Sequence, residues 1–202
     1  RVDEAMVEAQ AALKGDPRSA DANILLGMIA EQRGNQAEAG SRYAKAVALA
    51  PARGTALNDY GAWLCSNGRP AESLAMFDRA LADPAYSTPA AALSNAGSCA
   101  LTAGQAQRAA NYLETALQVD PASPIAHEVM AESRYRTGQY LEARAFSERR
   151  LSVAPASVKV LQLASQIEQK LGDTAAAARY VQRIGQEFPQ SRPVSPGDAS
   201  QR

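Results

Sequence analysis

Glycines recur along this chain at a nearly constant interval, and this interval restricts the possible folds more than any other feature. The recurring positions are Gly34, Gly68, Gly104, Gly138 and Gly172, at separations of 34, 36, 34 and 34 residues. Prolines keep step with them at Pro17, Pro51, Pro84, Pro121, Pro155 and Pro189. Because self-similarity at a fixed period of this length is typical of stacked structural repeats, the chain is predicted to be a repeat protein.

Residues 57–80 (LNDYGAWLCSNGRPAESLAMFDRA) contain one complete unit. Gly61 lies inside a first predicted helix and Gly68 ends it, while Ser73 and Phe77 are one helical turn apart on a second. This helix-turn-helix pattern with a period of 34 residues is the signature of the tetratricopeptide repeat (TPR). We therefore predict an all-α fold, a right-handed α-solenoid of TPR units. Its small and aromatic signature residues are interpreted as core packing at helix crossings.

The repeats divide the chain into one solenoid domain over residues 1–188 and a tail over 190–202, which is rich in Ser, Pro and Gly and predicted to be disordered. A partial repeat is expected over residues 1–19, its first helix missing. The complete repeats are expected near residues 20–53, 54–89, 90–123, 124–157 and 158–189. The link at residues 83–89 departs from the period, with two extra residues and two prolines that stiffen it.

Composition and motifs argue against several classes of function. The 21 basic and 21 acidic residues give a formal net charge of zero, so no nucleic-acid partner is predicted. The single histidine, His127, is interpreted as a structural residue, and no Cys-x-x-Cys, His-x-x-x-His, Walker or Gly-x-Ser-x-Gly motif is present. No enzyme activity, cofactor or metal site is therefore expected.

The first helices of TPR arrays line a concave groove that binds extended peptides or helices. This groove is predicted to be apolar near its N-terminal end and polar or acidic further on. A Lys and Arg clamp of the kind that chaperone adaptors use for a C-terminal carboxylate is absent from the corresponding positions. The predicted partner-binding residues are Ile24, Met28, Asn58, Asp59, Ala62, Asn95, Ser98, Glu132 and Tyr135. Asn58 and Asn95 are candidates for holding a partner's backbone by paired hydrogen bonds, although either could equally bridge neighbouring helical turns.

The two cysteines, Cys65 and Cys99, lie on the first helices of adjacent repeats. Their positions in the repeat differ by about 200° around a helix, so one can point forward along the stack and the other back. This arrangement permits a disulfide, which would indicate an oxidising compartment. The alternative is a pair of buried free thiols in a cytosolic protein.

Three segments are not consensus TPR features, and they give the chain a closer resemblance. They are Leu57-Asn-Asp-Tyr-Gly61 with Cys65, the link Asp83-Pro-Ala-Tyr86, and Asn95-Ala-Gly97-Ser-Cys99-Ala100. Over roughly residues 3–188 the chain resembles the PilF/PilW proteins of type IV pilus biogenesis.

The resemblance implies a non-enzymatic pilotin, an outer-membrane lipoprotein on the periplasmic side that helps the pilus secretin subunit to assemble. It also favours the disulfide over free thiols. The chain starts at Arg1, inside a predicted second helix, so a signal sequence and a lipid-bearing cysteine are expected to precede it, and any membrane contact is expected only through that lipid. The alternative is a general TPR scaffold for another cell-envelope or cytosolic complex.

Overall fold

The computed structural model describes residues 2–191, and these form eleven α-helices in a TPR arrangement with no strand among them. The chain divides into two compact units, Arg1–Pro121 and Ala122–Arg202. The all-α TPR fold expected from the sequence is confirmed. That the repeats form one right-handed solenoid stays a prediction.

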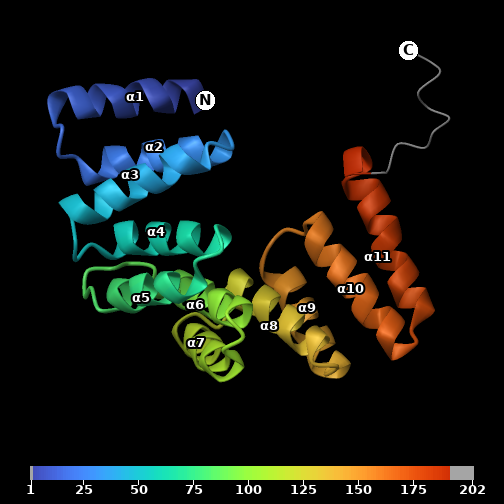
Figure 1. The fold of residues 1–202 in the computed structure, drawn as a ribbon. Coiled ribbons are helices and arrows are strands. Elements are labelled where there is room, and N and C mark those ends of the chain that lie inside the picture. The colour runs from blue at the N-terminus through green and yellow to red at the C-terminus, as the bar shows by residue number, and fades with distance from the viewer. Residues whose placement is uncertain (1, 192–202) are drawn as a thin grey trace, which may run out of the picture. The chain divides into compact units, whose positions relative to one another are not determined.

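The first unit consists of seven helices, of which six form three helix pairs (Figure 1). Helix α1 precedes the first pair and packs on α2. The pairs are α2 with α3, α4 with α5, and α6 with α7. The bounds are α1 Val2–Gly15, α2 Ala20–Gln32, α3 Gln36–Leu49, α4 Gly54–Ser66, α5 Pro70–Leu81, α6 Pro89–Thr102 and α7 Ala106–Val119.

The second unit consists of two helix pairs, α8 with α9 and α10 with α11, followed by a short 3-10 helix. The bounds are α8 Pro124–Arg136, α9 Tyr140–Val153, α10 Val158–Leu171, α11 Thr174–Glu187 and η1 Pro189–Ser191. Of the tail predicted to be disordered, residues 192–202 lie outside the described part of the chain.

The recurring glycines end the first helix of each pair, as predicted. Gly34 has a φ of 77°, in the left-handed region that only glycine adopts without strain, and the other four have φ between 72° and 82°. Around Gly34 the amide of Asn35 donates to the carbonyl of Ala30 at 2.8 Å, which satisfies one of the helix's last carbonyl groups. The chain can therefore reverse direction within a few residues.

A second set of glycines lies where the two helices of a pair cross. A Cβ atom on Gly27 would lie 2.8 Å from the ring of Tyr43, and one on Gly61 would lie 3.0 Å from the ring of Phe77. Both rings are buried. These contacts confirm that the signature residues serve core packing. His127, the only histidine, is also buried and lies beside Phe146, with ring centroids 6.1 Å apart.

Candidate partner-binding site

A pocket of about 450 Å³ opens on the first unit between α2, α3 and α4. It is lined by Met28, Glu31, Gln32, Tyr43, Asp59 and Ala62. Three of these residues, Met28, Asp59 and Ala62, are among the predicted partner-binding positions. Met28 is 53% exposed, which leaves its side chain available for contact.

Ile24 is a correction to the prediction, because it does not lie on the surface. It is 7% exposed and belongs to a core cluster with Tyr43 and Ala56. The cluster joins α2 to its pair helix and to the next repeat, and this packing covers the α2 face that carries Ile24. At the N-terminal end of the predicted groove, the pocket therefore carries the acidic side chains Glu31 and Asp59 beside the apolar Met28 and Ala62.

Asn58 and Asn95 lie together in the structure, although they are 37 residues apart. The Nδ2 of Asn95 donates to Oδ1 of Asn58 at 3.2 Å, and Nδ2 of Asn58 donates to Oδ1 of Asp59 at 3.1 Å. This chain of hydrogen bonds joins α4 to α6 and orients the Asp59 carboxylate. A direct role of these asparagines in holding a partner's backbone stays a prediction, as does a role for Ser98, which is exposed on α6.

The two carboxylates of the pocket are held in different ways. The Tyr43 hydroxyl, which is buried, donates to Oε2 of Glu31 at 3.0 Å. Burial raises the pKa of Asp59, the hydrogen bond from Asn58 opposes this increase, and the charge of Glu31 adds to it. Burial and the Glu31 charge also raise the pKa of Tyr43. Ionisation of Asp59 therefore costs more free energy than that of a fully solvated aspartate.

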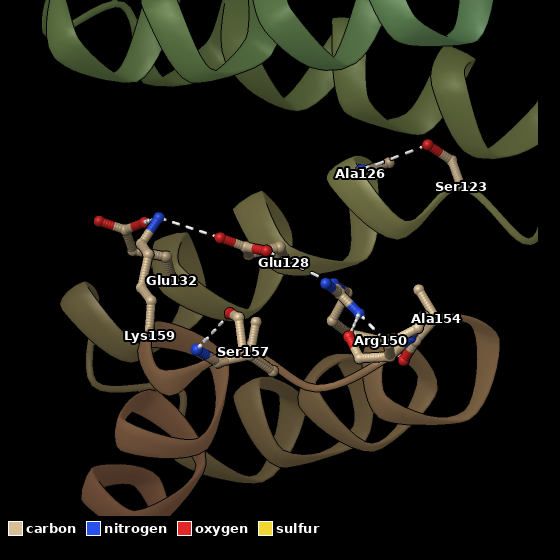
Figure 2. A network of polar contacts seen from close by, with 10 residues as sticks. Ser123, Ala126, Glu128, Glu132, Arg150, Ala154, Ser157 and Lys159 are labelled. Atoms are coloured by element: carbon tan, nitrogen blue, oxygen red, sulfur yellow. Dashed lines mark hydrogen bonds and ion pairs between the residues drawn. The ribbon is translucent and has the colours of Figure 1, made fainter. Parts of the chain in front are cut away.

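Glu132 and Tyr135, the remaining predicted residues, lie on α8 in the second unit. Glu132 forms ion pairs with Arg136 at 2.5 Å and with Lys159 at 3.6 Å, and Tyr135 packs against Tyr140. Figure 2 shows the neighbouring Glu128, which lies between Arg150 and Lys159 at 3.4 and 3.0 Å. The acidic side chains Glu128 and Glu132 are thus paired with basic residues of the chain itself.

Cys65 on α4 and Cys99 on α6 are joined by a disulfide, with their α-carbons 5.9 Å apart. The bond connects the first helices of adjacent repeats, the same pair of helices that the two asparagines connect. The hydroxyl of Ser73 lies 3.2 Å from the Cys99 sulfur. The surface of α4 and α6 is therefore fixed by a covalent bond and by side-chain hydrogen bonds.

The link after α5 folds back onto the start of α4. The carboxylate of Asp83 accepts hydrogen bonds from the amides of Gly54 at 2.7 Å and of Ala85 at 2.9 Å. The ring of Tyr86 covers Gly54 so closely that a Cβ there would lie 2.6 Å from its Cγ atom. The Asp-Pro-Ala-Tyr segment, interpreted from sequence as a sign of function, therefore has a structural role in its own repeat.

Sequence reasoning missed Glu31 and the role of Gly54. The signal for Glu31 was its position three residues after Met28, which places both side chains on one face of a helix. Gly54 gave no such signal, because its contact with Tyr86 bridges two segments far apart in the chain. In the described part of the chain there is no group of three potential metal ligands, and no helix is long and apolar enough to span a membrane.

Comparison with known proteins gives consistent matches. Two family models described as tetratricopeptide repeat match residues 1–54 and 100–167. The crystal structure of PilW, a type IV pilus biogenesis factor, is 32% identical, with a TM-score of 0.83 over 95% of this chain and 88% of that chain. The type IV pilus assembly protein PilF of Pseudomonas aeruginosa is 25% identical over 94% of this chain and 75% of its own length. A solved PilF structure has a TM-score of 0.77, with 25% identity over 94% of this chain and 86% of that chain.

Proposed function

Because the chain belongs to the PilF/PilW family of type IV pilus assembly proteins, which are non-enzymatic TPR proteins, we propose that it acts as a pilotin for the pilus secretin. In this role it binds a segment of the secretin subunit and promotes assembly of the multimeric outer-membrane channel. The observation that carries the proposal is the match to PilW over nearly the full length of both chains.

The surface formed by α2, α4 and α6 is the proposed binding surface. It presents Met28, Asp59 and Ala62 around one pocket and holds Asn58 and Asn95 in a fixed arrangement. The disulfide between α4 and α6 restricts movement of this surface before binding. A partner that binds a preformed surface loses less free energy to ordering than one that must arrange it.

The proposed location is the periplasmic face of the outer membrane. The Cys65–Cys99 disulfide supports an oxidising compartment, because structural disulfides persist there and are rare in the cytosol. Attachment by an N-terminal lipid rests on the family resemblance.

Deletion of the gene tests the proposed function. We expect loss of secretin multimers, detected by immunoblotting of outer-membrane fractions without boiling, and loss of surface pili. Expression of the full protein from a plasmid should restore both. Normal multimers at the outer membrane of the deletion strain would refute the pilotin role. Repeated co-purification with a different complex and without the secretin would favour the general scaffold.

A further inference from the structure

The pocket between α2 and α4 combines apolar walls with two carboxylates. Met28 and Ala62 provide aliphatic surface, while Glu31 and Asp59 provide the charge. Each carboxylate uses one oxygen within the protein, since Tyr43 donates to Oε2 of Glu31 and Asn58 donates to Oδ1 of Asp59. The other oxygen of each has no hydrogen-bond donor among the described residues. This leaves two acceptors at one pocket.

The charge of the pocket is not balanced by the protein. Among the described residues, neither Glu31 nor Asp59 forms an ion pair, and no Lys or Arg lines the pocket. In the second unit, by contrast, a first-helix carboxylate is paired, since Arg150 and Lys159 contact Glu128. The difference is important because two carboxylates near one another at a partly buried site repel each other until a cation neutralises them. Burial raises the pKa of Asp59, and the nearby charge of Glu31 adds to that increase.

We propose that the pocket binds the cationic side chain of a lysine or arginine on the partner segment. The aliphatic stem of that side chain would pack against Met28 and Ala62, and its charged end would donate hydrogen bonds to Glu31 and Asp59. Long basic side chains suit such a site because they bury an apolar stem while their charged end is hydrogen-bonded. The inference rests on the proposed function for the identity of the partner, but the chemistry of the pocket can be tested without it.

The test is a titration of the intact protein with four acetylated, amidated alanine pentapeptides whose central residue is Lys, Arg, norleucine or Glu. Binding is followed by NMR of ¹³C-methyl methionine, because the chain has only four methionines and the Met28 methyl lies at the pocket. We expect a saturable shift of the Met28 signal with the Lys or the Arg peptide. Norleucine, which has the apolar stem without the charge, should bind at least about tenfold more weakly.

Variants identify the groups responsible. The double variant E31Q/D59N keeps the shape of the side chains and their acceptors for Tyr43 and Asn58 but removes both charges, so it should lower the affinity for the cationic peptides about tenfold or more. The matched control E8Q/E114Q removes two charges from exposed positions on α1 and α7 and should change nothing. Equal binding of the norleucine peptide, no shift of Met28 with either cationic peptide, or unchanged affinity in E31Q/D59N would overturn the inference.

Secretin multimers in the deletion strain, with and without the variants, distinguish a failure of this inference from a failure of the proposed function. If gene deletion leaves secretin multimers intact, the pilotin role is refuted, even if the cationic peptides bind the pocket. If deletion abolishes multimers while E31Q/D59N restores them fully, the pilotin role stands and the two carboxylates of the pocket have no part in it. Loss of multimers with E31Q/D59N but not with E8Q/E114Q supports both.

Discussion

The carboxylate of Asp83 accepts a hydrogen bond of 2.7 Å from the backbone amide of Gly54, so the end of one repeat caps the first helix of the same repeat. The residue before that helix, Arg53, makes no side-chain cap, and the cap comes instead from Asp83, which lies 29 residues after Gly54. A negative charge at this position also interacts favourably with the helix N-terminus. The segment between α3 and α4 is also held by Arg79 of α5, whose guanidinium donates a hydrogen bond to the carbonyl of Pro51 at 2.7 Å.

We predict that D83A lowers the melting temperature at pH 7 and that D83N has a smaller effect, because asparagine keeps an acceptor but loses the charge. The hydrogen bonds from Gly54 and Ala85 lower the pKa of Asp83. Its stabilisation is therefore present above the unfolded pKa, about 3.9, and is lost as the pH falls through the lower folded value. Thermal unfolding followed by circular dichroism between pH 7 and 2.5 measures this. If the melting temperature of D83A stayed below that of the wild type by the same amount at every pH, this explanation would be contradicted. E114A, at an exposed position, serves as the control.

Substitution of Gly54 tests the contact with Tyr86. A Cβ at Gly54 would lie 2.6 to 2.8 Å from the Tyr86 side chain, so G54A should cost about 1–3 kcal/mol of unfolding free energy through overpacking. At Gly15 no atom lies within 4 Å of the added Cβ, so G15A is the matched control and should be nearly neutral.

Double substitution separates the overpacking from an effect on the helix itself. Adding Y86A to G54A removes the ring that the Cβ would strike, so the G54A cost should be smaller in the Y86A background. Urea unfolding of the four proteins gives the coupling energy. Equal costs of G54A in both backgrounds would show that Tyr86 is not the cause.

Much of the fold could be predicted because the period and the turn glycines are local signals. Gly34 to Gly172 end helices by their own backbone conformation, so their spacing alone predicts where helices stop. The crossing glycines predict which helices approach closely, since Gly27 and Gly61 each lie directly against the ring expected from the pattern. These signals depend on no contact outside one repeat.

The site was less predictable because its geometry depends on contacts between repeats. Ile24 occupies a groove position by count, but packing with Ala56 of the next repeat buries it. Asn58 and Asn95 were predicted as groove residues, and only the structure shows that they hydrogen-bond to each other. The unpaired charge at Glu31 and Asp59 could not be inferred from composition, because a net charge of zero says nothing about local pairing.

Removal of the disulfide should destabilise the first unit. In the chain-entropy description, a bond between residues 34 apart restricts the unfolded chain, and we expect C65A/C99A to lose about 2–4 kcal/mol. Urea unfolding of the wild type with and without dithiothreitol should reproduce most of this difference, while the variant should be insensitive to the reductant. Mass spectrometry of unreduced protein after thiol alkylation provides the direct check. Two alkylated cysteines in protein purified from an oxidising compartment would contradict the bond.

The charge of Asp59 should lower the folding stability of the protein at neutral pH, which is expected if this residue serves to bind a cation. Its pKa in the folded protein is raised, first by burial and also by Glu31, so the folded state binds the proton more tightly than the unfolded state does. Stability therefore decreases as the pH rises from the unfolded pKa, about 3.9, through the raised folded value. D59N, which keeps an oxygen for Asn58, should be more stable than the wild type at pH 7 by less than about 1 kcal/mol, because solvent screens a partly exposed charge.

The pH dependence of the stability difference between D59N and the wild type shows whether the charge of Asp59 is its cause. The advantage of D59N should shrink as the pH falls and vanish once Asp59 is protonated in both states, whereas E114Q should show no such trend. Melting temperatures at a series of pH values from 3 to 8 test this. If D59N were less stable than the wild type at pH 7, the carboxylate would be stabilised by a partner within the protein, and the pocket would not need a cation from outside.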